Sequence, residues 1–198
     1  LSKPDQTVTT TIDAKLQRYA YESLRTQLAA LASQKANAGA VLVLNNETGE
    51  VLAYVANSGL VEDSVWVDGV QAQRQAGSTL KPFLYGLAIE KNRLTAASVI
   101  DDAPINISTP LGLYVPQNYE HDFKGAVTVR TALASSLNVP AVLTLGKVGV
   151  EPFWQLLNDV GFNLQEQADY YGNALALGGA DITVWQLANA YRSLANGG

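Results

Sequence analysis

A serine and a lysine three residues apart, Ser78 and Lys81, are the strongest chemical signal in this sequence. A serine hydroxyl attacks a carbonyl only when a neighbouring base takes its proton. On a helix, residues three positions apart share a face, so the Lys81 amine can reach the Ser78 hydroxyl. The positive potential of a helix N-terminus favours a neutral amine and also favours negative charge developing near Ser78. The pair is therefore suited to acyl transfer through a covalent serine intermediate.

The Ser-x-x-Lys pattern alone is weak, because about one match arises by chance in a chain of this composition. The alternative interpretation is a solvated serine and lysine on the surface of a helix. Pro82 adds information, since a proline inside a helix is tolerated only in its first turn. We therefore predict a helix from about Ser78 to Asn92, with the candidate nucleophile at its start.

Hydrophobic periodicity and end signals predict the elements around this helix. Apolar runs at 40–44 and 51–55 flank a polar turn that contains glycine, which predicts a hairpin. Residues 101–127 contain proline, glycine and asparagine and few periodic apolar positions, which predicts an extended segment without helices. An isolated hairpin is marginal in water, so further strands are expected outside these 198 residues. Other helices are predicted at 13–34, 128–137, from Pro140 onward, 151–160 and 183–195, with Asp13, Thr128 and Thr183 as caps and Gly161 as a stop.

Composition excludes several classes of protein. The net charge is −5 and the 13 basic residues are scattered, which argues against a nucleic-acid-binding surface. The chain has no cysteine and one histidine, His121, so we expect neither a zinc site nor another cofactor. The neighbouring carboxylates Asp101 and Asp102 should point apart in an extended segment and should not share a metal. No apolar run is long enough to span a bilayer.

Two motifs and several longer stretches resemble one known family. Ser78-Thr79-Leu80-Lys81, followed by Pro82-Phe83, resembles the first motif of penicillin-binding proteins and serine β-lactamases. Ser136-Leu137-Asn138 resembles their Ser-x-Asn motif, and the two serines are 58 positions apart, similar to the family's separation. Several longer stretches are most similar to the bifunctional class A branch, and within it to the penicillin-binding protein 1C type. They are 10–13, 16–17, 40–44, 116–119, 127–133, 138–142, 176–179, 187–191 and 194–198.

The resemblance implies the α+β fold of serine β-lactamases and transpeptidases, an antiparallel sheet flanked by helices, which would be incomplete in this chain. Residues 1–12 would be a linker or edge segment, and residues 13–198 the N-terminal part of the transpeptidase domain. The family's third motif, Lys-Thr-Gly or a close variant, is absent here and is expected after Gly198 with the C-terminal strands. The strand near 40–44 would then lack a partner, which predicts edge-to-edge pairing with another copy or with the remainder of the protein.

The resemblance also implies a role for each site residue. Ser78 would attack the carbonyl of a D-Ala-D-Ala stem peptide and form an acyl-enzyme, with its own N–H as one oxyanion donor. Lys81 would be the general base, a role that is disputed within the family. Ser136 would relay a proton to the leaving group, and Asn138 would hold Lys81 and the donor peptide's amide. The amine of a second stem peptide would then take the acyl group.

The favoured function is that of a D,D-transpeptidase that cross-links peptidoglycan and is the target of β-lactams. One alternative is a D,D-carboxypeptidase or serine β-lactamase; another is a non-catalytic penicillin-binding or scaffold domain. Without the third motif, residues 1–198 alone are expected to be inactive. The resemblance further implies an upstream glycosyltransferase domain and a periplasmic location at a bacterial inner membrane, with the anchor outside this chain.

Overall fold

The structure is a computed structural model that describes residues 7–36, 38–57, 67–109 and 112–197. Contacts between Cα atoms divide the chain into two compact units. The first comprises Leu1–Gln73 and Thr183–Gly198, and the second is Arg74–Ile182. The predicted boundary between a segment 1–12 and a domain 13–198 stays a prediction, and residues 1–6 lie outside the described ranges.

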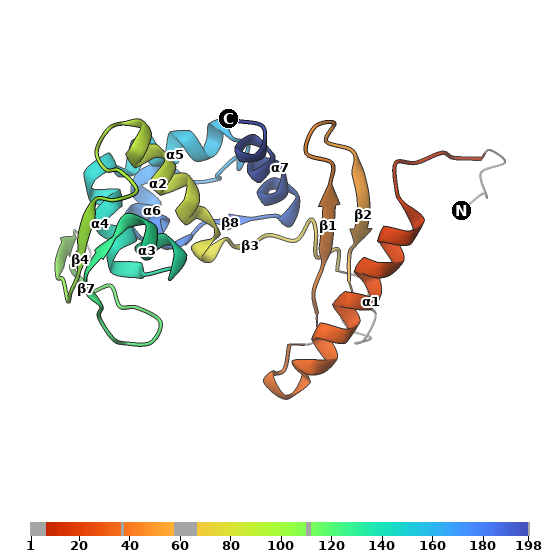
Figure 1. Cartoon of the computed structure of the whole chain (residues 1–198), viewed down its shortest axis with the longest axis horizontal. Coiled ribbons are helices and arrows are strands. Elements are labelled where there is room, and N and C mark those ends of the chain that lie inside the picture. The colour runs from red at the N-terminus through yellow and green to blue at the C-terminus, as the bar shows by residue number, and fades with distance from the viewer. Residues whose placement is uncertain (1–6, 37, 58–66, 110–111, 198) are drawn as a thin grey trace. The chain divides into compact units, whose positions relative to one another are not determined.

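The first unit is built on the predicted hairpin, which the structure confirms. Strands β1 (Val41–Leu44) and β2 (Val51–Val55) pair in antiparallel fashion, and helix α1 (Ala14–Ala30) lies beside them (Figure 1). The Asp13 carboxylate accepts hydrogen bonds from the first-turn N–H groups, as predicted from its position. A short 3₁₀ helix, η1 (Ala32–Gln34), follows α1. Packing between helix and hairpin buries a cluster of Leu16, Ala20, Leu24, Val41, Val43, Ala53 and Val55.

Helix α7 (Val184–Ala195) completes the first unit and contacts β1. A capping box begins the helix, because Thr183 and Gln186 each bond the other's backbone N–H. At the other end, the side chains of Arg192 and Asn196 both donate to the carbonyl of Asn46 in the hairpin turn. Among the described residues the hairpin has no third strand. Edge-to-edge pairing of β1 with another chain stays a prediction.

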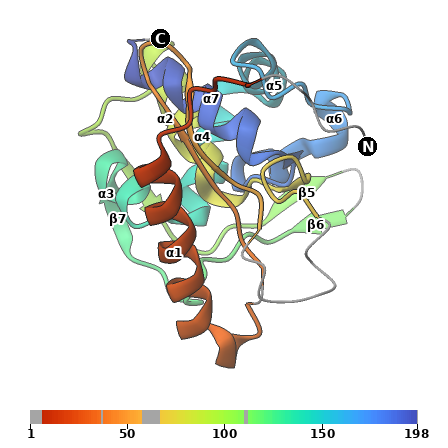
Figure 2. The ribbon, with the colours of Figure 1, turned by 90° about the vertical axis from the view of Figure 1, so that its right-hand side faces the viewer.

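The second unit contains strands that the sequence analysis expected only outside the chain, so that prediction was incomplete. Strand β4 (Val99–Asp102) pairs with β7 (Gly125–Thr128), and β5 (Ile107–Thr109) pairs with β6 (Gly112–Tyr114) as a separate hairpin (Figure 2). Strand β3 (Arg74–Gln75) pairs with β8 (Asp181–Ile182). Each of these strands has only two to four residues. A run that short is too brief for alternation of apolar and polar residues to be visible.

Helices form most of the second unit. They are η3 (Gly77–Leu80), α2 (Lys81–Glu90), α3 (Val129–Ala134), α4 (Asn138–Val148), α5 (Val150–Asp159), α6 (Ala168–Tyr171) and η4 (Gly172–Leu177). Helices α2 and α4 pack on each other and both contact α5 and η4. Their buried side chains include Leu84, Leu145 and Phe153, each fully shielded from solvent. This core holds the start of α2 against the start of α4.

None of the helices in the described ranges combines the length and the apolar character needed to cross a membrane.

Candidate active site

The turn that carries Ser78 and Lys81 differs from the predicted α-helix in its first residues. Gly77–Leu80 form the 3₁₀ helix η3, and α2 begins only at Lys81, with Pro82 in its first turn. In a 3₁₀ helix the residues i and i+3 are eclipsed, so this geometry aligns Ser78 with Lys81 more closely than an α-helix would. Ser78 is exposed, whereas Lys81 is fully buried.

A glycine on a distant segment supports this turn. The N–H of Gly77 donates to the carbonyl of Gly178 at 3.0 Å, and the N–H of Ala76 donates to that of Ala180 at 2.9 Å. Gly77 and Gly178 both have positive φ, at 58° and 73°. This close backbone contact fixes the position of Gly77 and therefore of Ser78, the next residue.

Replacing Gly178 with alanine is expected to destabilise the protein. An added Cβ would lie 1.9 Å from the carbonyl oxygen of Gly77, and the backbone there has a φ that side chains disfavour. We expect a loss of about 2 kcal/mol or more in the free energy of unfolding. Gly86→Ala in α2 is the matched control, since its Cβ would meet nothing within 4 Å. That control should be neutral or stabilising by up to about 1 kcal/mol. Denaturant titration measures both, and equal stabilities for the two variants would contradict the prediction.

The Lys81 amine is enclosed by acceptors from the second motif. Its Nζ donates to the Ser136 carbonyl at 2.7 Å, the Leu137 carbonyl at 3.2 Å and the Asn138 Oδ1 at 2.7 Å. The Ser136 Oγ lies 3.2 Å away. Burial lowers the pKa of Lys81 to about 8, which brings the neutral amine within reach of physiological pH. Lys81 is therefore hydrogen-bonded to Ser136 and Asn138, and Ser78 lines the same pocket as those two residues. The catalytic roles of the four residues stay predictions.

A left-handed residue directs the second motif toward the lysine. Ser136 has a φ of 53° and lies between the end of α3 at Ala134 and the start of α4 at Asn138. A non-glycine residue in this conformation is uncommon and often marks a functional site. Here it turns the chain so that both the carbonyl and the hydroxyl of Ser136 lie within bonding distance of Lys81. The predicted helix 128–137 therefore ends three residues early.

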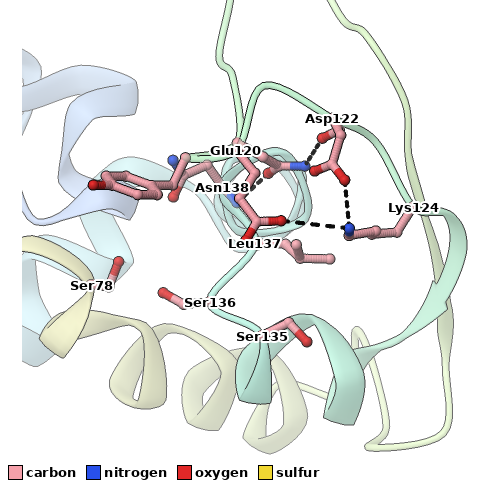
Figure 3. A pocket seen from close by; sticks show the side chains of 10 residues that line it. Ser78, Glu120, Asp122, Lys124, Ser135, Ser136, Leu137 and Asn138 are labelled. Carbon is pink, nitrogen blue, oxygen red and sulfur yellow. Dashed lines mark hydrogen bonds and ion pairs between the residues drawn. The ribbon is translucent and has the colours of Figure 1, made fainter.

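The two serines open on one pocket of about 560 Å³. Figure 3 shows their hydroxyls directed toward a common space, whereas the hydroxyl of the neighbouring Ser135 points away from it. The lining residues are Ser78, Asn118, Tyr119, Glu120, Asp122, Lys124, Ser135, Ser136, Leu137 and Asn138. A carbonyl compound in this pocket could therefore approach the exposed Ser78 hydroxyl, with that of Ser136 opposite.

Sequence reasoning missed two buried polar residues, Asn118, which lines the pocket, and Asp102, which lies behind it. The N–H of Asn138 donates to the Asn118 Oδ1 at 2.8 Å, and the Asn118 Nδ2 donates to both carboxylate oxygens of Asp102, at 2.9 and 2.8 Å. Asp102 is fully buried and Asn118 is 3% exposed. Asn118 belonged to a stretch of family resemblance but received no role, and Asp102 was considered only as a metal ligand.

The other singled-out polar residues show no sign of a metal or a triad. Asp101 is exposed while Asp102 is buried, so the two carboxylates point apart as predicted. Within the described ranges, no three metal-binding side chains come together. His121 is exposed in a loop, where its Nδ1 lies 2.8 Å from the Gln117 Oε1.

Comparison with known proteins points to one family. Residues 39–198 match the family described as penicillin binding protein transpeptidase domain. Penicillin-binding protein 1C of Escherichia coli is 35% identical over the whole chain, which covers 25% of that protein. The crystal structure of penicillin-binding protein 1A from Haemophilus influenzae is similar at 32% identity with a TM-score of 0.70, covering 81% of this chain and 24% of that one.

A second similar structure is that of PonA1 from Mycobacterium tuberculosis in complex with penicillin V. It shares 25% identity at a TM-score of 0.77 and covers 96% of this chain and 51% of its own. These similarities confirm the predicted fold class, with short antiparallel sheets among helices. The chain spans about a quarter of the length of the curated relatives it matches.

Proposed function

This chain belongs to the penicillin-binding protein transpeptidase family, and on that premise we propose that it carries the acylation centre of a peptidoglycan D,D-transpeptidase. One observation carries the proposal. Lys81 directly follows the 3₁₀ turn that carries Ser78, and its amine donates hydrogen bonds to Ser136 and Asn138, which line the same pocket as Ser78.

The first step is acylation of Ser78. Its Oγ attacks the carbonyl carbon of the penultimate D-Ala of a stem peptide, and its proton passes to the neutral Lys81 amine. The Ser78 N–H stabilises the oxyanion of the tetrahedral intermediate. The C–N bond then breaks, the terminal D-Ala leaves as an amine that has gained the proton, and an ester to Ser78 remains.

Ser136 is the route by which the proton leaves Lys81. The carbonyls of Ser136 and Leu137 and the Asn138 Oδ1 can only accept hydrogen bonds, whereas the Ser136 Oγ can both accept and donate. That hydroxyl also opens on the pocket (Figure 3). It can therefore take a proton from Lys81 while giving its own to the leaving amine. The amine of a second stem peptide then attacks the ester carbonyl carbon and forms the new amide bond. The bond from that carbon to the Ser78 Oγ breaks, and the amine's proton passes to the Oγ, which restores the hydroxyl.

Asn138 has its amide orientation set by the protein. Its Nδ2 donates to the carbonyl of Gln117 at 2.8 Å, which turns the Oδ1 toward Lys81. The family resemblance assigns this amide a second contact, to the donor peptide. We propose that the same amide group holds both the base and the substrate.

The partners and location follow from the family. We propose stem peptides ending in D-Ala-D-Ala as substrates, β-lactams as acylating inhibitors, and a glycosyltransferase domain in the same protein. The location would be periplasmic, at a bacterial inner membrane. The Lys-Thr-Gly motif is absent from residues 1–198. We therefore propose the activity for the natural protein that contains residues 1–198, and not for these residues alone.

The experiment is acylation of that natural protein by a fluorescent penicillin, followed by mass spectrometry of the labelled peptide. We expect one label on Ser78. Incubation with a stem pentapeptide and an amine acceptor should then give the cross-linked amide. Release of the shortened stem peptide as a free acid, with no amide product, would indicate a carboxypeptidase. Rapid hydrolysis of penicillin would indicate a β-lactamase. A protein that binds penicillin without a covalent label would be a non-catalytic member, and the proposal would be wrong.

A further inference from the structure

A buried carboxylate lies behind the active site, and no step of the proposed reaction uses it. Asp102 is fully shielded from solvent at the end of β4. Both of its oxygens receive N–H donors, from the Asn118 side chain and, at 2.9 Å, from the backbone of Lys124. A buried charge is costly unless it is paired or well hydrogen-bonded. Three donor contacts satisfy Asp102, so the question is what its place in the fold achieves.

Hydrogen bonds connect Asp102 to Lys81 through two residues, Asn118 and Asn138. Asn118 accepts from the Asn138 N–H at 2.8 Å, and the Asn138 Oδ1 accepts from Lys81 at 2.7 Å. The Asn118 Nδ2 also donates to the Asp122 carbonyl at 2.9 Å. With its Nδ2 directed at these oxygens, Asn118 has only its Oδ1 available to accept. The Asp102 carboxylate therefore fixes which way the Asn118 amide faces, and that in turn determines that it can accept from Asn138.

On the basis of the proposed function, we propose that Asp102 and Asn118 are positioning residues for acylation. They hold the first N–H of α4 and thereby keep the Asn138 amide on the Lys81 amine. The N-terminus of α4 supports this role. Its cap residue, Leu137, has no side-chain oxygen that could accept from the first N–H groups, and Asn118 supplies that oxygen from another segment.

The simpler explanation is that Asp102 and Asn118 only stabilise the fold, by joining β4 to the loop before β7. The two explanations predict different kinetics. A purely structural loss lowers the fraction of molecules that react, while the remainder react at the normal rate. A positioning loss leaves every molecule reactive but slow, because small misplacements of reacting groups reduce the rate steeply.

The first test is Asp102→Asn in the natural protein, assayed by the time course of penicillin acylation. We expect the rate constant to fall about 10- to 100-fold while the final stoichiometry of labelling stays at one. Asp101→Asn is the matched control, since it makes the same change at the exposed neighbouring residue of β4. Its rate should stay within about twofold of the unchanged protein, as expected for a surface substitution.

A charge swap provides the second test, in case a single variant folds poorly. Asn118→Asp alone places two carboxylates in contact and should be the slowest variant. Combining it with Asp102→Asn restores one amide and one carboxylate. The amide can still accept from Lys124, and the carboxylate can still accept from Asn138. The donor to the Asp122 carbonyl is lost in both variants that carry Asn118→Asp. The double variant should therefore react faster than Asn118→Asp alone, because its two carboxylates are no longer in contact.

Three results would overturn the inference. In Asp102→Asn these are a normal rate at full stoichiometry, or reduced stoichiometry with a normal rate for the molecules that react. The third is a double variant that reacts no faster than Asn118→Asp alone. These failures are distinct from failure of the proposed function, in which the unchanged protein itself takes no label on Ser78.

Discussion

Ser78→Ala is expected to abolish covalent labelling by penicillin in the natural protein. Alanine removes the attacking oxygen and leaves no other nucleophile at that position, so the acylation rate should fall by at least about 1,000-fold. The Ser78 side chain is exposed, so its loss should change the free energy of unfolding by less than about 0.5 kcal/mol. Gel fluorescence after labelling measures the first effect, and denaturant titration measures the second.

Ser135→Ala is the control for this substitution. Ser135 also lines the pocket, but its hydroxyl points away from the space shared by Ser78 and Ser136 (Figure 3). The control should label at close to the normal rate. If Ser78→Ala still took up penicillin covalently, the nucleophile would be another residue and the proposed mechanism would fail.

The second large effect is expected for Lys81→Met. Methionine has a similar length and no amine, so it removes the proposed base while filling most of the same volume. We expect the acylation rate to fall by about 100- to 10,000-fold, the range typical for loss of a general base. Lys147→Met is the matched control, because Lys147 is exposed on α4. A Lys81→Met variant that acylates at the normal rate would exclude Lys81 as the base.

The pH dependence of acylation should report the same lysine. In the proposed mechanism the neutral amine is the reactive form, and burial lowers the pKa of Lys81 to about 8. The rate in the unchanged protein should therefore rise as pH increases through about 8 and level off above it. A rate that falls over this interval would mean that the protonated amine is the active form, as a donor to the substrate.

Lys81 should also affect stability, with a sign that follows from its pKa. The pKa is lowered from 10.5 in the unfolded chain to about 8 in the folded protein. Between these values the unfolded state binds the extra proton, so stability should rise with pH across that interval. Below about pH 8 both states are protonated and this contribution is constant. The rise should be absent in Lys81→Met, as measured by denaturant titration at several pH values.

Local signals in the sequence predicted most of the helices. Asp13, Thr128 and Thr183 each cap the helix that they were expected to begin. These predictions succeeded because a cap bonds N–H groups two or three residues away, within reach of a short sequence pattern. The hairpin β1–β2 was found for the same reason, since its turn and both strands are adjacent in the chain.

Elements that depend on distant partners were missed. Strand β4 pairs with β7, and β3 pairs with β8 about a hundred residues later. Helix η3 was expected to be α-helical, and the left-handed turn at Ser136 was not expected at all. Each of these conformations is stabilised by contacts with other segments, such as the bond from Gly77 to Gly178. Propensity along the chain does not contain that information.

The candidate nucleophile and base could be predicted from the chain alone, because three-residue spacing on a helix brings the Ser78 and Lys81 side chains to one face. The surroundings of the amine could not, because they come from distant segments. Asn138 lies 57 positions from Lys81, Asn118 lies 20 from Asn138, and Asp102 lies 16 from Asn118. Contacts over such separations follow no period along the chain. They arise when packed helices and paired strands place the ends of α2, α4 and β4 together, which no local pattern specifies.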